Sequence, residues 1–432
     1  MNGTFARTLT PGAAFLLGLA VLTPVRRAQA ATGILVPTFG GDGRVVTDFA
    51  GGTDNGRRVA IQTDGRIVVS GFDSTAQDFL LARYDTDGSL DTSFDTDGKV
   101  TTDFGANEQA HGMALQTDGK IVVVGLSNAS SDFDFAVARY NTDGSLDTTF
   151  DTDGRVTTDL NGNDQDMAFA VAIQTDGKIV VGGFSGSADF ALVRYNTNGG
   201  LDTSFDTDGI VLTDFGGNDQ AQAIAIHTDG RIVASGFSNA VANDVAVARY
   251  NTSGSLDTTF DGDGRVTTDF SGGSDQGRSV VIQPDGKIVV AGLVPGSDFG
   301  LIRYNANGSL DTSFDGDGRV VTDLSGGSND QANQLLRQSD GKLVVAGLSN
   351  AAGHFDFAVA RYHTSGSLDT TFSPDGWVTV DFGGMSNDQA YGIVEDAGSF
   401  VVVGLTNTNG EFEFDLGLAR IAADLIFADG FE

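Results

Sequence analysis

Gln174-Thr175-Asp176-Gly177-Lys178-Ile179-Val180-Val181-Gly182-Gly183-Phe184 is the stretch that decides the fold. Its Asp-Gly dipeptide separates two apolar runs, which predicts a β-hairpin with a two-residue type I′ turn. The pattern recurs about every 55 residues, as expected for a repeat protein. The other dipeptides begin at Asp64, Asp118, Asp229, Asp285 and Asp340, and a degenerate seventh copy is Asp396-Ala397-Gly398. We therefore predict seven repeats of one hairpin-centred unit.

Each unit is predicted to contain four short strands. In the second unit they are residues 99–104, 110–116, 120–126 and 133–140. The third strand is almost continuously apolar, which indicates burial on both faces. Seven such units over residues 31–421 predict an all-β fold, a seven-bladed β-propeller of four-stranded antiparallel blades. An open solenoid is the alternative, but it needs capping repeats, and the sequence has none.

The second strand carries small residues, such as Ala168, Ala170 and Ala172, and is therefore predicted to lie innermost. The first strand of a unit then becomes the outer strand of the preceding blade. On this arrangement residues 44–49 complete the last blade beside residues 416–421, and the two ends of the chain close the ring.

An arginine ends the fourth strand of every unit, and an aspartate lies in every first strand. If these strands are neighbours, the two side chains form cross-strand ion pairs at the outer edge of each blade. Sevenfold recurrence favours a scaffold over a binding site. The arginines are Arg83, Arg139, Arg194, Arg249, Arg303, Arg361 and Arg420. The aspartates are Asp48, Asp103, Asp159, Asp214, Asp269, Asp323 and Asp381.

The chain of 432 residues has 58 acidic and 25 basic side chains, a net charge of −33. This charge repels phosphate backbones, so we expect no nucleic-acid partner. A negative charge of this size suits a cation or a basic partner. The alternative is that the acids on turns only keep a glycine-rich sheet protein soluble. Cysteine is absent, which excludes thiol catalysis and zinc or haem sites built on cysteine.

The two ends of the chain predict export. Residues 1–30 resemble a signal peptide, with an apolar run at 13–22 and the cleavage pattern Ala28-Gln29-Ala30. No later segment approaches the roughly 20 apolar residues of a membrane span. Residues 422–432 form a C-terminal tail. We expect a monomer that is secreted, periplasmic or at the cell surface of a bacterium.

Acidic Asp-x-Asp-Gly loops recur between the fourth strand and the next first strand. Such oxygen-rich loops suit calcium, although they lack the distal glutamate of an EF-hand. The alternative is that these residues only build turns. No motif requires another cofactor. The candidate calcium ligands are Asp95, Asp97, Asp151, Asp153, Asp206, Asp208, Asp261, Asp263, Asp315 and Asp317.

A binding site is expected where the repeats differ. One position near the start of the second strand varies most in chemistry, and an innermost second strand would place it at one mouth of the central channel. We predict ligand contacts there, the alternative being a solvated rim. The seven residues are Arg57, His111, Phe169, Gln222, Arg278, Asn333 and Tyr391. Shortly before them stand the acids Asp54, Glu108, Asp164, Asp219, Asp275, Asp330 and Asp388.

Two recurring motifs carry a resemblance to a known family. Residues 145–150 (Ser-Leu-Asp-Thr-Thr-Phe), followed by Asp153-Gly154-Arg155-Val156 and the opening stretch, resemble the delta-60 repeat family of uncharacterised bacterial repeats. The resemblance covers roughly residues 34–421. It implies a β-propeller, often secreted or surface-associated, and it implies no activity. The end of the chain, residues 426–432, is also similar to a short tail of some exported gammaproteobacterial proteins.

These observations predict a non-enzymatic binding or interaction module. Its partner is expected to be a protein, a glycan or a small ligand. The alternatives are a calcium-dependent propeller hydrolase of lactones or glycans, and a purely structural surface component. A hydrolase needs a cluster of acids in the channel that breaks the sevenfold pattern, and no unit has such an excess.

Overall fold

The computed structural model describes residues 35–423 except 50, 163, 187–188, 241, 271, 325, 328, 384–385 and 409–412. The predicted signal peptide and residues 424–432 of the predicted tail lie outside the described part. The described residues form 28 strands in seven four-stranded antiparallel sheets. None of them forms a helix long and apolar enough to cross a membrane.

The sheets are the seven blades. The first blade has β2 (Asp54–Ile61), β3 (Ile67–Asp73), β4 (Phe79–Tyr84) and β5 (Lys99–Thr102). The second has β6 (Glu108–Leu115), β7 (Ile121–Ser127), β8 (Asp134–Tyr140) and β9 (Arg155–Thr158). The third has β10 (Met167–Ile173), β11 (Ile179–Ser185), β12 (Asp189–Tyr195) and β13 (Ile210–Thr213). The fourth has β14 (Asp219–Ile226), β15 (Ile232–Ser238), β16 (Asp244–Tyr250) and β17 (Arg265–Thr268).

The remaining blades follow the same order. The fifth has β18 (Gln276–Ile282), β19 (Ile288–Val294), β20 (Asp298–Tyr304) and β21 (Arg319–Thr322). The sixth has β22 (Asp330–Arg337), β23 (Leu343–Ser349), β24 (Asp356–Tyr362) and β25 (Trp377–Val380). The seventh has β26 (Gln389–Asp396), β27 (Ser399–Thr406), β28 (Asp415–Ala422) and β1 (Arg44–Thr47).

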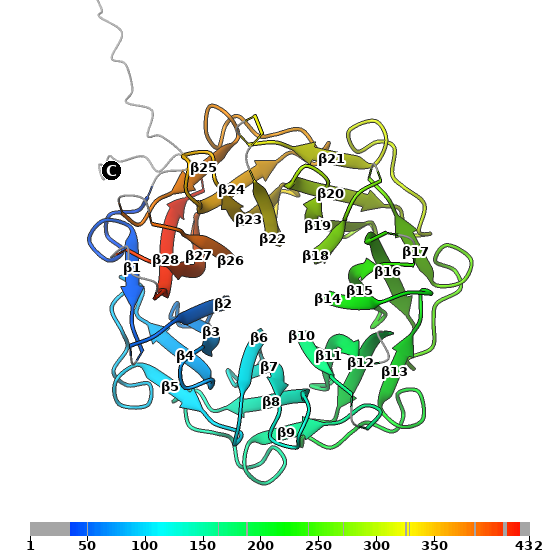
Figure 1. The fold of residues 1–432 in the computed structure, drawn as a ribbon, viewed down its shortest axis with the longest axis horizontal. Helices are drawn as coiled ribbons and strands as arrows, with labels where there is room; N and C mark the ends of the chain where they lie inside the picture. The colour runs from blue at the N-terminus through cyan, green and yellow to red at the C-terminus, as the bar shows by residue number, and fades with distance from the viewer. Residues whose placement is uncertain are drawn as a thin grey trace, which may run out of the picture.

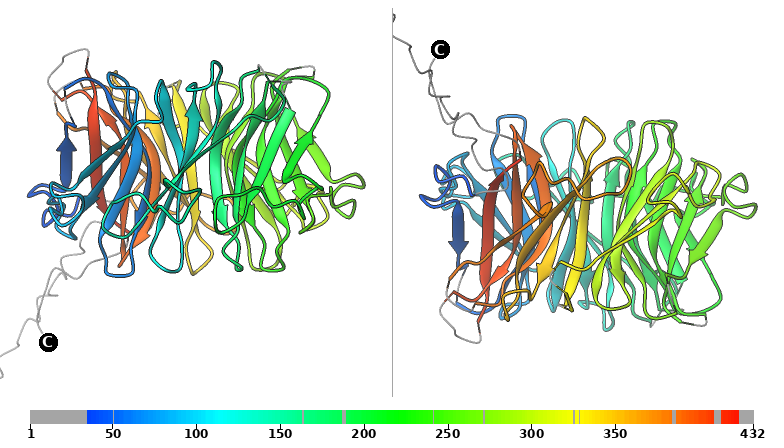
Figure 2. Two further views of the ribbon diagram at one scale, coloured as in Figure 1. Left: turned by 90° about the horizontal axis from the view of Figure 1, so that it is seen from below. Right: turned by 90° about the horizontal axis from the view of Figure 1, so that it is seen from above.

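Figure 1 shows the blades arranged around a central axis, with β2, β6, β10, β14, β18, β22 and β26 innermost. In the side views of Figure 2 the strands run between the two faces of the ring. The predicted seven-bladed propeller and the innermost position of the second strand are thus confirmed. The apolar sequence of the third strand of each unit fits a position inside the blade. In the second unit this strand is β7, which pairs with a strand on each side, and every one of its residues is buried.

The ring is closed by strands from both ends of the chain, as predicted. β1 pairs with β28 in antiparallel register, from Arg44 opposite Ala419 to Thr47 opposite Leu416. The buried Tyr84 hydroxyl of the first blade donates to Thr47 Oγ1 at 2.8 Å. An equivalent bond at 2.7 Å joins Tyr140 to Thr102 between the first two blades. The closing junction is therefore built like an internal one.

The hairpin turns differ from the predicted type I′ turn. In the second unit Gly119 N donates to Gln116 O (2.9 Å) and Gln116 N to Lys120 O (2.8 Å), and only Gly119 has a positive φ, of 85°. This is a type I turn followed by a left-handed glycine. The aspartate instead accepts a hydrogen bond from Lys120 N at its Oδ1. In the degenerate seventh copy Ala397 and Gly398 both have positive φ.

The hydrophobic core lies between neighbouring blades. One cluster joins Phe79 and Leu81 of β4 to Ala110, Ile121 and Val123 of the second blade. These side chains are fully buried. Burying one such aliphatic or aromatic side chain contributes about 1.5–3 kcal/mol. Packing of blade against blade therefore supplies much of the stability of the ring.

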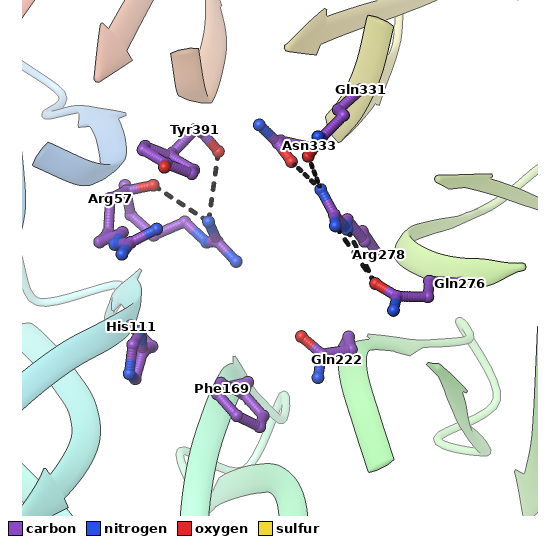
Figure 3. A pocket seen from close by; sticks show the side chains of 10 residues that line it. Arg57, His111, Phe169, Gln222, Gln276, Arg278, Gln331, Asn333 and Tyr391 are labelled. Atoms are coloured by element: carbon purple, nitrogen blue, oxygen red, sulfur yellow. Dashed lines mark hydrogen bonds between the residues drawn. The ribbon is translucent and has the colours of Figure 1, made fainter. Parts of the chain in front are cut away.

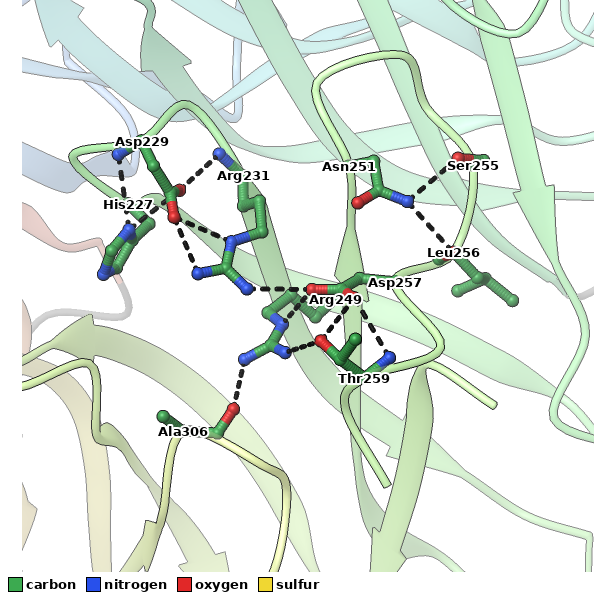
Figure 4. A network of polar contacts seen from close by, with 10 residues as sticks. All are labelled: His227, Asp229, Arg231, Arg249, Asn251, Ser255, Leu256, Asp257, Thr259 and Ala306. Atoms are coloured by element: carbon green, nitrogen blue, oxygen red, sulfur yellow. Dashed lines mark hydrogen bonds and ion pairs between the residues drawn. The ribbon is translucent and has the colours of Figure 1, made fainter. Parts of the chain in front are cut away.

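The predicted ion pairs between strand-four arginines and strand-one aspartates are wrong. Figure 4 shows that Arg249, at the end of β16, pairs with Asp257 of the following segment, with 2.8 Å between Nε and Oδ2. Its Nη1 donates to the main-chain oxygen of Ala306 in the next blade. In an antiparallel pair the end of one strand lies beside the start of the other, and Arg249 N indeed bonds to Gly264 O. The strand-one aspartates lie at the opposite end.

Candidate functional site

Each innermost strand contains a β-bulge, and the bulged residue is the position that the sequence singles out. In β6 the pairing passes from Ala110 opposite Gly125 to Gly112 opposite Val124, which leaves His111 without a partner residue. A bulge redirects one side chain and bends the strand. The seven bulged residues are Arg57, His111, Phe169, Gln222, Arg278, Asn333 and Tyr391.

A glycine on the adjacent strand makes each bulge sterically feasible. A Cβ atom at Gly125 of β7 would lie 1.8 Å from the main-chain oxygen of Gln109. No side chain fits there, so the strand that faces the bulge needs glycine. Glycines take the same place in the other blades, at residues 71, 183, 236, 292, 347 and 404. These glycines are the sequence signal of the bulges.

The structure brings all seven predicted residues together in one pocket at the channel (Figure 3). Its volume is about 320 Å³. Arg58, Gln276 and Gln331 also line it and were not among the predicted residues. Gln276 and Gln331 each lie two residues before a bulged residue, so the alternation of the strand could have indicated them. Arg58 directly follows the bulged residue Arg57. Successive side chains of a regular strand point to opposite faces, so both arginines line the pocket only because of the bulge.

One side of the pocket is aromatic. The His111 ring lies 5.2 Å from the Phe169 ring, and Phe169 stacks on Phe184 with 5.9 Å between ring centroids. The guanidinium carbon of Arg57 lies 4.1 Å from the centroid of the Tyr391 ring. The Nε atom of Arg57 is buried and has no hydrogen-bond partner among the described residues. This side offers flat apolar faces and a cation with unused donors.

The opposite side is lined by amides that hold an arginine. Nη1 of Arg278 donates to Asn333 Oδ1 at 2.8 Å and to Gln331 Oε1 at 3.0 Å, and Nη2 donates to Gln276 Oε1 at 3.2 Å (Figure 3). These acceptors are neutral, so they orient the guanidinium without neutralising its charge. The Asn333 amide nitrogen donates to Ala390 O at 2.7 Å, which fixes its orientation in turn.

The pocket is cationic within an acidic protein. Arg57, Arg58 and Arg278 line it, and its described lining contains no carboxylate. Burial and the neighbouring Arg57 lower the pKa of Arg58 to about 10, which leaves its guanidinium charged at neutral pH. Burial, with Arg57 and Arg58 nearby, holds the pKa of His111 well below its usual value, so that imidazole is neutral. The three arginines alone therefore supply the positive charge.

The acids that precede the bulges lie outside this pocket. In six units they are the predicted residues, but in the third unit the position belongs to Asp166, because Asp164 is exposed while Asp166 is fully buried. Asp166 is three residues before Phe169, as Glu108 is before His111. Two nearby aspartates, Asp164 and Asp166, made this register ambiguous in the sequence. These acids are buried between blades.

The Asp-x-Asp-Gly loops show turn-forming hydrogen bonds. Asp97 Oδ1 accepts from Lys99 N at 2.9 Å, and Asp95 has a positive φ of 46°. Asp153 pairs with Arg155 at 2.8 Å. Calcium binding by these loops stays a prediction.

Comparison with known proteins supports the repeat fold. Six segments match a family model described as a domain of unknown function (DUF5122) beta-propeller, at residues 62–94, 116–150, 174–205, 227–260, 283–314 and 338–372. Each segment begins at a hairpin and ends at the buried phenylalanine that follows the fourth strand of the unit. No curated protein matches the sequence.

Similar solved structures have varied functions. A catalytically inactive virginiamycin B lyase from Staphylococcus aureus, crystallised with quinupristin, is 10% identical, with 87% of this chain and 98% of that chain covered and a TM-score of 0.53. Sqt1 from Chaetomium thermophilum is 11% identical over 86% and 96% of the two chains, with a TM-score of 0.45. The polysaccharide lyase Uly1 is 13% identical over 92% and 98%, with a TM-score of 0.48. Likeness at this level of identity shows the fold alone.

Proposed function

We propose that this protein is an exported β-propeller that binds an anionic ligand at the mouth of its central channel. The observation that carries this proposal is the grouping of three arginines in a pocket whose described lining has no carboxylate. A buried guanidinium is costly unless a charged or strongly polar partner satisfies it. In a chain of net charge −33, a cationic pocket of this kind favours an anionic group over a cation.

The remaining pocket residues narrow the ligand class. The faces of Phe169 and Tyr391 suit a ring, since aromatic side chains stack on the apolar faces of ligands. The amides of Gln222, Gln276 and Gln331 offer both donors and acceptors, which suits hydroxyl groups. An acidic saccharide, with a carboxylate on a hydroxylated ring, combines these features. The pocket volume of about 320 Å³ lies in the range of small-ligand sites.

Binding is favoured over hydrolysis. Hydrolysis of a glycan requires a pair of carboxyl groups on either side of the scissile bond. The described lining offers none, and His111, the one histidine there, has a neutral and half-buried ring. The signal-like residues 1–30 and the resemblance to the delta-60 repeat family support an exported, surface-associated role.

Calorimetric titration tests the proposal. The purified protein is titrated with oligogalacturonate, with the neutral galactose oligomer of the same length, and with inorganic phosphate. We expect saturable binding of the oligogalacturonate and none of the neutral oligomer. If phosphate binds and oligogalacturonate does not, the pocket is an anion site but its ligand is not an acidic saccharide. Absence of binding by all the anions would overturn the proposal and leave a structural role.

A further inference from the structure

Acidic side chains from three strand ends meet at the junctions between blades. At the first junction they are Asp78, just before β4, Asp103, just after β5, and Glu108, the first residue of β6. One carboxylate oxygen from each lies within 4.8 Å of the other two. The same arrangement occurs in Asp134, Asp159 and Asp166; in Asp189, Asp214 and Asp219; and in Asp48, Asp54 and Asp415. At another junction His354 joins Asp356 and Asp381.

The backbone holds these acids in place. Glu108 N donates to the main-chain oxygen of Gln77 at 2.6 Å, and Asp166 N donates to Phe133 O at the same distance. These bonds tie the start of an innermost strand to the chain just before β4 or β8 in the preceding blade. Asp103 Oδ1 accepts a hydrogen bond from Gly105 N and so caps its own loop. The carboxylates are thus gathered by the fold itself.

Two buried carboxylates point to a ligand because each has an oxygen without a partner. Glu108 is 0% exposed, and its Oε1 accepts from Ala106 N and Ser127 Oγ, both at 3.0 Å. Its Oε2 has no hydrogen-bond partner among the described residues. Asp134 is 3% exposed, and its Oδ1 is likewise unpartnered. Leaving such a charged group buried and unsatisfied is unfavourable.

Mutual repulsion adds to this cost. Carboxylate oxygens of Asp48, Asp54 and Asp415 lie within 4.8 Å of one another, so their negative charges repel. At the first junction, Arg155 donates to the main-chain oxygen of Asp103, but its guanidinium pairs with Asp153 and not with the junction carboxylates. A bound cation would satisfy the free oxygens and remove the repulsion.

We propose that the junctions with three carboxylates bind divalent cations, and that the cation is calcium. Calcium takes 6–8 oxygen ligands in a flexible geometry, so three carboxylates can be completed by main-chain oxygens and water. Magnesium requires a stricter octahedron and gives up its water reluctantly. The junction of His354 has a nitrogen ligand and is less suited to calcium. The cations would join neighbouring blades at the face where the innermost strands begin.

Counting bound calcium by native mass spectrometry tests the proposal, with two matched variants. Asp103→Asn changes a junction acid whose Oδ1 caps a loop N–H, and the amide oxygen can still accept that bond. Asp97→Asn makes the same change in an Asp-x-Asp-Gly loop, where Oδ1 caps Lys99 N. Both side chains are exposed, so both variants should fold, which a thermal melt in chelator checks.

We expect the parent protein to bind several calcium ions, D103N to bind one fewer, and D97N to bind the same number as the parent. Calcium at about 1–5 mM, which covers the range of weak extracellular sites, should raise the melting temperature, and magnesium should raise it less. Two results would overturn the proposal. The first is that the parent protein binds no calcium in this range. The second is that D97N loses a calcium ion and D103N does not, which would mean that the Asp-x-Asp-Gly loops are the calcium sites.

Discussion

The guanidinium carbon of Arg57 lies 4.1 Å from the centre of the Tyr391 ring, so a cation of the first blade stacks on an aromatic ring of the last. Both are bulged residues of innermost strands, and they are brought together only when the ring closes. A cation–π contact of this kind contributes about 0.5–2 kcal/mol, depending on how well water is excluded. Ring closure therefore also completes the candidate site.

Replacing two pocket arginines should abolish anion binding. In Arg57→Gln with Arg278→Gln, each change removes a charge-assisted contact worth about 1.5–3 kcal/mol, so we expect the Kd for the anion to rise at least about 100-fold. Calorimetric titration measures it. The matched control is Arg155→Gln with Arg265→Gln, which removes the same charge outside the pocket. Equal affinity in both double variants would show that the pocket is not the binding site.

Anion affinity should be nearly constant between pH 8 and about 6.5, the usual pKa of histidine. The pKa of His111 is held well below that value by burial and by the neighbouring arginines, so the imidazole stays neutral over this range. Affinity measured at several pH values checks this. A marked rise on acidification, lost in His111→Phe, would mean that His111 becomes protonated in the complex.

Asp257→Asn should destabilise the protein by about 3 kcal/mol at neutral pH, because it leaves the guanidinium of Arg249 buried without its carboxylate. The Arg249 and Asp257 side chains are 6% and 7% exposed. Denaturant unfolding of D257N and of the exposed-site variant Asp261→Asn measures the difference. The exposed change should have little effect.

The same difference should shrink in acid. Hydrogen bonds from Thr259 and Arg231 and the charge of Arg249 outweigh burial and lower the pKa of Asp257 to about 2. A carboxylate whose pKa is lower in the folded state stabilises the protein above its unfolded pKa of about 3.8, and this contribution is lost as the pH falls through 2. If the difference in unfolding free energy between D257N and the parent stays constant from pH 5 to about 2, the ion pair is contradicted.

Gly236→Ala should lower the free energy of unfolding by about 2 kcal/mol or more, because overpacking against a rigid backbone is destabilising. The new Cβ would lie 1.7 Å from the main-chain oxygen of Gln220, beside the bulge at Gln222. Gly200→Ala is the control, because its Cβ would meet nothing nearer than 3.5 Å. Thermal and denaturant unfolding compare the two. Equal stability of the two variants would mean that the position facing the bulge does not require glycine.

The chain ends should be held as firmly as an internal junction. Thr47→Val and Thr102→Val each remove the acceptor of a buried tyrosine hydroxyl, at the closing and at the first internal junction. Each should lower the free energy of unfolding by about 1–3 kcal/mol, and by similar amounts. If only T102V is destabilising, the ring is loosely closed.

Much of the architecture could be predicted from the sequence because its signals are local and repeated. The Asp-Gly hairpins, the apolar third strands and the phase of the repeat indicated the blades, their strand order and the closure by residues 44–49, of which β1 comprises Arg44–Thr47. The position that varies between units also identified all seven bulged residues. A local pattern repeated seven times is informative because each copy must meet the same packing demand.

Contacts between distant residues were decided by the tertiary structure. The arginine of strand four was assigned the wrong partner, because antiparallel pairing places Arg249 beside Gly264 and Asp257 and not beside the strand-one aspartate. The bulges, which add Arg58 to the channel wall, depend on the fit of one strand against the glycine of the next. The carboxylates of Asp78, Asp103 and Glu108 meet only because a junction combines two blades. Sequence periodicity specifies which face a side chain takes, whereas register, bulges and blade contacts fix which side chains meet.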